Sequence, residues 1–355
     1  MPFREAFRPR SVSIPTLVRI KPQALDRVGI YLQRAEIETV SLYFSDGLPD
    51  PLLRRVKRSL EDHGIRLRQQ TAVQGASQEE ANRLVSHSEN TAQALIGLGG
   101  GRALDTAKYM SAEVKKPYYA VPTSLSNDGF CSPQSSLTVD GHRQSVATTM
   151  PYGVIVDTEA CLQAPRKLWL SGVGDLVAKL TAVRDWKIAF HEAGERVDDF
   201  AALLSDASVY QFIGRPTFDL QGTQLLATAL MLNGISMAVC SSSRPASGSE
   251  HLISHALDAL QPEPQLHGFQ VGVATYLISL LHENGTETIG TLFDQTGFWD
   301  MCAESPFSRS LWQQAVRRAP TMKENFYTVL SRPGQVDRAL QYMDQDPMLN
   351  RCIVR

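Results

Sequence analysis

The order of apolar and amphipathic segments between residues 39 and 157 restricts this chain to few folds. Short β-branched runs alternate there with amphipathic stretches, which is the pattern of a parallel sheet covered by helices. The predicted strands are Thr39–Phe44, Ile65–Thr71, Ala94–Leu98, Tyr118–Val121 and Gly153–Val156. The predicted helices are Asp50–His63, Ser77–Ser88 and Arg102–Val114, and a hairpin is predicted over Ser136–Thr149 around Asp140 and Gly141. We therefore expect an α/β domain in the first half.

The pattern changes after Ala164 and Pro165, where strand signals fade and helical periodicity takes over. The predicted helices are Lys167–Phe190, Phe200–Phe212, Thr223–Val239 and Glu250–Leu260. The last segment, from Thr286 to Arg355, has helical character but no motif that we can interpret. A chain of 355 residues exceeds the usual size of a single core, so we expect two domains, 1–161 and 162–355, with the boundary near Cys161.

Charge and cysteine usage exclude several classes of protein. The formal net charge is −2, so no electrostatic footprint for nucleic acid or anionic lipid is present, and we expect neither as a partner. The cysteines are far apart, odd in number and form no C-x-x-C pair, which argues against disulfides and thiolate zinc sites. They are Cys131, Cys161, Cys240, Cys302 and Cys352. A reducing compartment, the cytoplasm, is the expected location.

Neither the N-terminal segment nor the most apolar stretches of the chain indicate a secretory signal or a membrane segment. The N-terminal arginines Arg4, Arg8 and Arg10 are not followed by the apolar region that a secretory signal requires. The most apolar stretches, Leu225–Cys240 and Phe269–Leu281, contain polar residues and are shorter than a bilayer span. We expect both to be buried helices and expect no membrane insertion.

Three consecutive glycines, Gly99, Gly100 and Gly101, follow the apolar strand at 94–98 and open a helix. Unhindered backbone N–H groups and the positive end of a helix dipole point there at one spot, which suits a pyrophosphate. The spacing is not that of a Rossmann loop, because Arg102 occupies the last glycine position and the loop follows the third predicted strand. The alternative is a tight strand-to-helix turn without a ligand.

Asp46 ends the first predicted strand, where an acidic side chain would accept hydrogen bonds from ribose hydroxyls and repel a 2′-phosphate. This interpretation favours NAD over NADP. The alternative is a turn formed by Asp46 and Gly47.

One aspartate and three histidines are candidate ligands and catalysts. We place Asp175 at the start of a helix, His251 and His255 one turn apart on another helix, and His267 at the start of a third. Two imidazoles and one carboxylate are typical of a catalytic metal site, because they leave coordination positions open. The alternatives are a helix N-cap for Asp175, a hydrogen-bonded core position for His255, and a cap or surface position for His267.

Taken together, these segments resemble the sn-glycerol-1-phosphate dehydrogenase branch of a superfamily. That superfamily also holds glycerol dehydrogenases, iron-type alcohol dehydrogenases and dehydroquinate synthases. The resemblance covers at least residues 97–267 and is carried by 99–108, 121–129, 172–179, 181–187 and 245–257. The strings Ser-Asn-Asp-Gly and Ala-Val-Arg-Asp-Trp-Lys are what point to this branch.

The resemblance implies a dehydroquinate synthase-like fold: an α/β nucleotide-binding domain followed by an all-α domain that binds metal and substrate. It implies that Asp175, His251 and His267 hold one divalent metal, zinc first, with nickel or iron as alternatives. Asp128 and His255 are implied as substrate-contacting catalytic residues, with Asp175 also beside the substrate. The implied contacts to NAD or NADP, together with Asp46 above, are Gly99, Gly100, Gly101, Asp105, Thr123, Ser124, Ser126 and Ser132.

The implied function is NAD(P)- and metal-dependent reduction of dihydroxyacetone phosphate to sn-glycerol 1-phosphate. Alternatives are a dehydrogenase of glycerol or another unphosphorylated polyol, a cyclase that uses NAD transiently, and a non-catalytic relative. The partner is then a small phosphorylated ketone, and a homo-oligomer is left open. Lys179, Arg184 and Arg244 are candidate donors to the phosphate.

Two departures from the family pattern affect this interpretation. Phe269 stands where much of the superfamily has a carboxylate, a difference that bears on which substrate is bound. Lys21, Pro22 and Gln23 replace a glycine-rich turn of the relatives, which we expect to alter a loop that faces the cofactor.

Overall fold

Six parallel strands form the centre of the first half of the molecule, in the order β1-β8-β5-β4-β2-β3. The computed structural model describes residues 11–87, 91–261 and 264–354. The strands are β1 (Leu17–Lys21), β2 (Thr39–Ser45), β3 (Arg66–Val73), β4 (Ala94–Gly99), β5 (Tyr118–Pro122) and β8 (Gly153–Asp157). The five predicted strands are confirmed, and each end agrees to within two residues.

The sequence gives little sign of β1. Its residues alternate apolar and basic side chains and are only half-buried, because β1 lies at the edge of the sheet and pairs with β8 alone. The short helix α1 (Val28–Arg34) that follows was also not predicted.

Alternating side chains of the strands pack against helices on both faces of the sheet. Ile96 and Leu98 of β4 lie in one core cluster together with side chains of α2 (Asp50–Asp62). Leu95 lies in the opposite cluster with side chains of α4 (Gly101–Val114). The remaining helices of this half are α3 (Gln78–His87) and α5 (Thr158–Gln163). The predicted helix end at Ser88 lies outside the described residues, as do the arginines at positions 4, 8 and 10.

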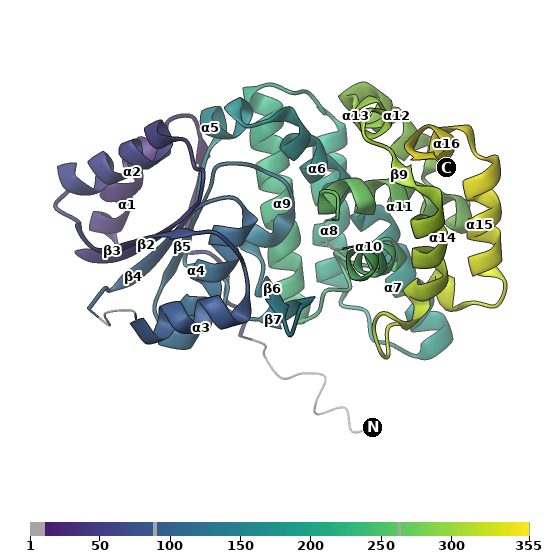
Figure 1. Cartoon of the computed structure of the whole chain (residues 1–355), viewed down its shortest axis with the longest axis horizontal. Coiled ribbons are helices and arrows are strands. Elements are labelled where there is room, and N and C mark those ends of the chain that lie inside the picture. The colour runs from purple at the N-terminus through teal and green to yellow at the C-terminus, as the bar shows by residue number, and fades with distance from the viewer. Residues whose placement is uncertain (1–10, 88–90, 262–263, 355) are drawn as a thin grey trace.

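The predicted hairpin is confirmed and projects from the sheet-containing half toward the helical half (Figure 1). Its antiparallel strands are β6 (Gln134–Val139) and β7 (His142–Ala147). Asp140 and Gly141 both have positive φ, which is the conformation that a two-residue hairpin turn needs.

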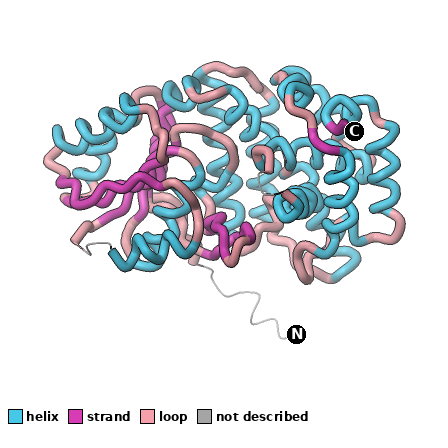
Figure 2. Tube along the Cα trace, in the orientation of Figure 1, coloured by secondary structure: helices cyan, strands magenta, loops and turns pink. Residues whose placement is uncertain are grey.

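The second half consists almost entirely of helices, as predicted (Figure 2). The exception among the described residues is a two-residue parallel pairing of β9 (Phe307–Ser308) with β10 (Ile353–Val354). The helices are α6 (Arg166–Val177), α7 (Lys179–Ala193), α8 (Asp199–Ile213), α9 (Leu220–Cys240), α10 (Ser249–Leu260), α11 (His267–His282), α12 (Thr286–Thr296), α13 (Phe298–Glu304), α14 (Arg309–Arg318), α15 (Gln335–Gln345) and α16 (Pro347–Cys352).

The prediction of one helix over 167–190 was wrong, because the chain forms two helices that meet at Ala178. Helical periodicity continues through this junction, so the apolar pattern alone does not reveal it. The junction places Asp175 in the last turn of α6 and Lys179 at the start of α7.

Helix α9 is the one described helix long and apolar enough to cross a membrane, with a mean hydropathy of 1.4 in its most apolar window. It packs against α8, α6 and α5, and more than half of that window is buried inside the molecule. This packing is that of a core helix, which is what the sequence predicted for Leu225–Cys240.

The two halves share a core. One continuous apolar cluster joins Val154 and Val156 of β8 to side chains of α6, α9, α10 and α11. Ala160 and Cys161 of α5 belong to different clusters, one under the sheet and one in the helical half. The domain boundary near Cys161 stays a prediction, and it lies in the helix that contacts both cores.

Candidate functional site

The aspartate and two of the histidines that were predicted to hold a metal come together in the helical half. Among the described residues, Asp175, His251 and His267 form a cluster whose possible ligand atoms lie within 4.8 Å of one another. The Asp175 Oδ1 atom is 3.5 Å from His251 Nε2 and 3.8 Å from His267 Nε2. Asp175 is 1% exposed and His251 is 7% exposed. The prediction that these three side chains lie together is therefore confirmed, and their role as metal ligands stays a prediction.

Close contact between α6 and α11 explains how Asp175 and His267 meet. A Cβ atom at Gly174 would collide with the backbone carbonyl of Gly268, and one at Gly268 would collide with the carbonyl of Ser171. Gly174 and Gly268 thus allow the backbones of α6 and α11 to come into contact. The prediction that Asp175 starts a helix was wrong, since it lies in the last turn of α6. His267 is the first residue of α11, as predicted.

Each imidazole is held by a hydrogen bond on the ring nitrogen that faces away from Asp175. His251 Nδ1 lies 2.9 Å from Glu250 Oε1, and the buried Glu250 also accepts from Thr181 Oγ1 at 2.9 Å. His267 Nδ1 lies 3.0 Å from Ser254 Oγ, and that hydroxyl donates to Gln270 Oε1 at 2.6 Å.

With Nδ1 as the donor, each Nε2 atom presents a lone pair to the space beside Asp175. Metal-binding histidines commonly have such partners, which fix the tautomer and the ring orientation. The donor set of two imidazoles and one carboxylate, supported in this way, fits a divalent metal such as zinc.

A buried charge pair adjoins these three residues. Lys179 Nζ lies 2.9 Å from Asp128 Oδ2 and 3.4 Å from Asp175 Oδ1, and its side chain is fully buried. The backbone N–H of Asp128 donates to Asp175 Oδ2 at 2.9 Å. The predicted substrate contact Asp128 is therefore tied directly to the candidate metal ligand.

These contacts shift the pKa values of the ionisable side chains at the site. Burial alone would lower the pKa of Lys179, but the Asp128 and Asp175 carboxylates outweigh it and raise that pKa. Burial opposes ionisation of Asp175, yet Lys179 and the two histidines hold its pKa well below the ordinary value. Burial and the Asp175 charge raise the pKa of Asp128. Asp175 is thus an anion at neutral pH and is available as a ligand.

Two of the three basic residues considered for the phosphate are already engaged. Lys179 is enclosed by carboxylates, as described above. Arg244 is 1% exposed; its guanidinium pairs with Glu195, donates to the Tyr327 carbonyl at 2.8 Å and lies on the Phe326 ring. The suggestion that these two residues bind the phosphate is not supported by their surroundings.

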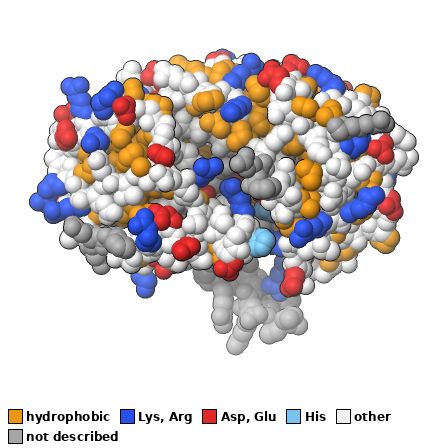
Figure 3. Space-filling view, in the orientation of Figure 1, with side chains coloured by type: hydrophobic (Ala, Val, Ile, Leu, Met, Phe, Trp, Pro, Cys, Tyr) orange, Lys and Arg blue, Asp and Glu red, His pale blue; other side chains and the backbone are white. Residues whose placement is uncertain are grey.

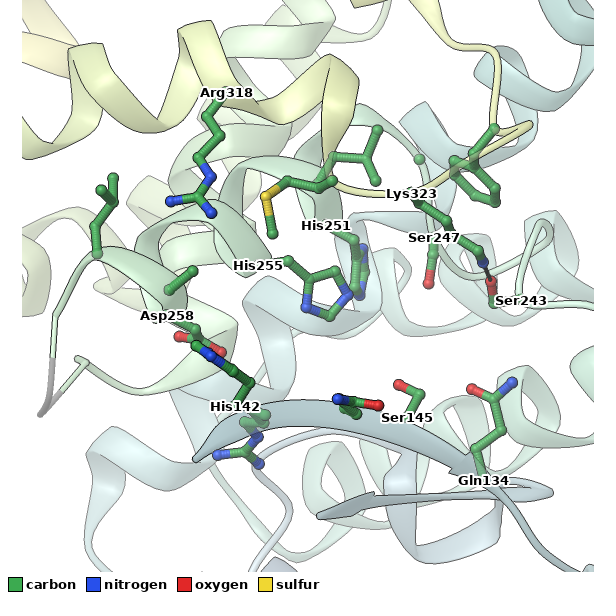
Figure 4. Close-up of a pocket in the computed structure, with 18 of the residues that line it drawn as sticks. Gln134, His142, Ser145, Ser243, Ser247, His251, His255, Asp258, Arg318 and Lys323 are labelled. Atoms are coloured by element: carbon green, nitrogen blue, oxygen red, sulfur yellow. Dashed lines mark hydrogen bonds between the residues drawn. The ribbon is translucent and has the colours of Figure 1, made fainter. Parts of the chain in front are cut away.

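A cavity of about 970 Å³ lies between the β6–β7 hairpin and α10, and His251 and His255 line it. Figure 4 shows the two rings next to each other, with the β-hairpin on the opposite side. His255 lies one turn after His251 on α10, as predicted. Burial, with a smaller contribution from His251, lowers the pKa of His255 to about 4, so its imidazole is neutral at pH 7.

The glycine loop forms a tight turn at the carboxyl end of β4. Gly99 has φ +126°, and a Cβ atom there would collide with the Ser45 hydroxyl at the end of β2. Gly100 donates its N–H to Ser45 Oγ at 2.9 Å, and Gly101 begins α4. A Cβ atom at Gly101 would have no neighbour within 4 Å, so the backbone of the loop is open to a ligand.

This turn lies at a switch point of the sheet. The neighbouring strands β2 and β4 continue into α2 and α4, which cover opposite faces. Ligands of open α/β sheets bind in the crevice that such a divergence leaves at the carboxyl ends of the strands. Asp46 follows β2 directly and is exposed beside the loop, where the sequence placed it.

The other predicted cofactor contacts gather at the same edge. Thr123 follows β5 and donates its backbone N–H to the Gly99 carbonyl at 3.0 Å. Ser124 and Ser126 lie in the same segment, and the Ser126 carbonyl accepts from the Ser171 hydroxyl of α6 at 2.9 Å. Residues 123–126 therefore connect the glycine turn with the metal-ligand helix α6.

Asp105 and Ser132 are held together by a buried lysine. Lys108 Nζ lies 3.4 Å from Asp105 Oδ1, 3.3 Å from Ser132 Oγ and 2.7 Å from the Gly129 carbonyl. Burial raises the pKa of Asp105 and lowers the pKa of Lys108. Lys108 was not predicted as a site residue. It thus holds the turn that follows Asp128 against helix α4.

Comparison with known proteins agrees with this geometry. The family model of iron-containing alcohol dehydrogenases matches residues 19–165. A glycerol-1-phosphate dehydrogenase of Methanosarcina mazei is 34% identical over 326 residues, which are 90% of this chain and 91% of that protein. The enzyme of the same name from Haloquadratum walsbyi is 32% identical over 328 residues, covering 90% and 92% of the two chains. The chain belongs to the glycerol-1-phosphate dehydrogenase family.

Solved structures support the fold of this family member. Glycerol dehydrogenase from Schizosaccharomyces pombe superimposes with a TM-score of 0.75 at 17% identity, over 95% of this chain and 91% of that one. The expected combination of an α/β half and a helical half is thereby confirmed.

Both departures from the family pattern have structural explanations. Phe269 is 7% exposed and packs against Phe298 at a centroid distance of 5.2 Å, so it belongs to the core and does not line the cavity described above. Gln23 has φ +57°, a left-handed conformation that favours glycine. Gln23 therefore takes a backbone conformation in the turn after β1 that glycine adopts more easily, and an effect of this turn on the cofactor stays a prediction.

Several residues of this site were missed from the sequence. Glu250, Ser254 and Gln270 support the candidate ligands from behind, and Lys179 was considered only for the phosphate. Glu250 precedes His251 directly, but neighbouring residues on a helix face different directions, so adjacency does not indicate their contact.

Proposed function

We propose that this protein reduces dihydroxyacetone phosphate to sn-glycerol 1-phosphate with NADH or NADPH and a divalent metal, with zinc as the first choice. The observation that carries the proposal is the convergence of Asp175, His251 and His267, each ring supported by a buried partner. The named activity of relatives that match over nine-tenths of the chain gives the substrate.

The candidate metal would be held by Asp175 Oδ and the Nε2 atoms of the two histidines. When bound, the metal supplies Lewis-acid stabilisation of charge on the ketone oxygen, and the nicotinamide supplies hydride. Glu250 and Ser254 keep both imidazoles in the tautomer that this arrangement needs. Lys179 compensates the buried carboxylates of Asp128 and Asp175.

His255 acts in this proposal as a neutral imidazole. With a pKa of about 4 it lacks the second ring proton of an imidazolium at neutral pH, so its role is to hydrogen-bond a substrate hydroxyl through one ring nitrogen and relay a proton from water through the other. This modifies the sequence-based hypothesis, in which a pKa near neutrality made His255 the proton donor itself.

For the cofactor we propose that the pyrophosphate binds at Gly99–Gly101, with Asp46 at the adenosine ribose. The open backbone at Gly101 and the exposed carboxylate beside the loop support this. Thr123, Ser124, Ser126, Asp105 and Ser132 are proposed as further contacts. The cytoplasmic location, the absence of nucleic acid and membrane partners, and the homo-oligomer remain predictions.

A spectrophotometric assay tests the proposal. Chelator-stripped protein is supplied with zinc, nickel or iron, and oxidation of NADH and NADPH is followed with dihydroxyacetone phosphate and with dihydroxyacetone. We expect metal-dependent oxidation with the phosphorylated ketone. A preference for dihydroxyacetone would favour a polyol dehydrogenase, and no net oxidation with either ketone would favour a cyclase or a non-catalytic relative.

A further inference from the structure

The cavity beside the candidate metal ligands has a marked imbalance of charge. Among its described lining residues, Arg143, Arg318 and Lys323 are basic, whereas Asp258 is the one carboxylate. Lys and Arg side chains are visible where the sheet-containing half meets the helical half (Figure 3). An excess of cations around a cavity attracts a negatively charged ligand.

Lys323 differs from the other two cations because its ammonium group is held in place. Its Nζ atom donates to the Ser243 hydroxyl at 3.0 Å and lies 4.1 Å from the centre of the Phe326 ring. Arg143 donates a hydrogen bond to Ser136 on the exposed hairpin. The side chain of Arg318 makes no hydrogen bond or ion pair within the described part of the chain. A charge that is already positioned loses less entropy when it binds an anion.

Two cationic side chains, Arg244 and Lys323, lie against the Phe326 ring, and they differ in their ion-pair partners. Arg244 stacks on the ring and is paired with Glu195. Lys323 shares the ring but has no carboxylate within ion-pair distance among the described residues. Burial and the Arg244 charge lower the pKa of Lys323, and the Glu195 carboxylate offsets this only in part. An anion bound at Lys323 would add to that offset.

Lys323 also lies on the same cavity as the histidines that are proposed to act on the ketone. Lys323, His251 and His255 all line this cavity. Figure 4 shows Lys323 with Ser243 and Ser247 on one side of the cavity, next to the rings of His251 and His255. An anion bound to Lys323 would therefore lie beside the candidate metal ligands.

We infer that Lys323, with the hydroxyls of Ser243 and Ser247, anchors the phosphate of the substrate and so selects phosphorylated over unphosphorylated ketones. The inference rests on the proposed function, and it replaces the candidates Lys179 and Arg244; the third candidate, Arg184, is not among the described residues that line the cavity. The ammonium group and two hydroxyls supply charge-assisted hydrogen bonds of the kind that phosphate oxygens accept.

Kinetics of matched variants test this assignment. In Lys323→Met we expect KM for dihydroxyacetone phosphate to rise roughly 10- to 100-fold, the size of a lost charged hydrogen bond. Turnover of dihydroxyacetone should change by less than about threefold, because that ketone has no phosphate to lose. Lys323→Arg should recover most of the loss. Arg318→Gln, the comparison variant, removes a charge from the same cavity and should change the ratio between the two substrates much less than Lys323→Met, because Arg318 contributes only to the general excess of positive charge.

A binding measurement separates this inference from the proposed function. Calorimetric titration with inorganic phosphate should show binding to the metal-loaded wild type and strong weakening in Lys323→Met, at unchanged metal content and melting temperature. If the wild type fails to reduce dihydroxyacetone phosphate, the proposed function is wrong and this titration still decides the anchor. Equal loss with both ketones, unchanged phosphate binding in Lys323→Met, or a selective loss in Arg318→Gln as large as that in Lys323→Met would overturn the assignment.

Discussion

The glycine loop and the metal-ligand cluster are built in opposite ways. The loop offers backbone groups of consecutive residues, Gly99 to Gly101, supported by one hydroxyl from the neighbouring strand. The cluster uses side chains from α6, α10 and α11, and each ring depends on a further side chain behind it. A site made of backbone tolerates changes in side-chain chemistry but not in shape, whereas a site made of supported side chains depends on several separate residues.

The largest effect should come from removing a ligand of the cluster. His267→Ala leaves two ligands, so we expect loss of stoichiometric metal and a fall in kcat/KM of more than about 10³-fold. Metal analysis and steady-state kinetics measure both, with His191→Ala as a surface-histidine control. A variant that stays fully active without metal would refute the metal assignment.

A smaller effect is expected when the support behind a ligand is changed. Glu250→Gln keeps the shape but removes the charge that orients His251, so metal affinity should fall roughly 10- to 100-fold. Competition with a chelator measures this, and Glu61→Gln on the surface is the control. Unchanged affinity would mean that the carboxylate only fills space.

On the loop side, shape should matter more than chemistry. Gly100 has negative φ, and a Cβ atom there would lie 3.9 Å from Ser45 Oγ, so Gly100→Ala should fold normally. The added methyl group would obstruct the approach of a pyrophosphate, and we expect a roughly tenfold rise in KM for the nicotinamide cofactor with unchanged metal content. Gly290→Ala in α12 controls for the substitution itself. A normal cofactor KM would mean that the loop is only a turn.

The smallest predicted effect concerns cofactor choice at the edge of this loop. Asp46→Asn keeps the turn-forming ability but removes the charge, so the ratio of kcat/KM for NADPH to that for NADH should rise about fivefold. Asp62→Asn, an exposed carboxylate on α2, is the control. An unchanged ratio would mean that Asp46 only forms the turn and does not contact the cofactor.

The same contrast explains what could be predicted from the sequence. Strands β2 to β5 and the loop after β4 follow from local patterns, because their apolar residues and glycines are consecutive. The meeting of Asp175 with His251 and His267 came from the family resemblance, since nothing local relates residues so far apart. Glu250, Ser254 and Lys323 were not assigned roles, because hydrogen bonds between side chains leave no periodic signal in the sequence.

Strand β1 was missed for a related reason, and its position affects how the chain folds. β1 pairs with β8, and Asp157 at the end of β8 accepts the backbone N–H of Leu25, which lies 132 residues earlier. At a synthesis rate of 5 to 20 residues per second, the ribosome needs roughly 7 to 26 s to deliver that partner. The first strand of the protein is therefore the last to enter its sheet, and in a nascent chain that ends before β8 the strand β5 lies at the edge of the sheet.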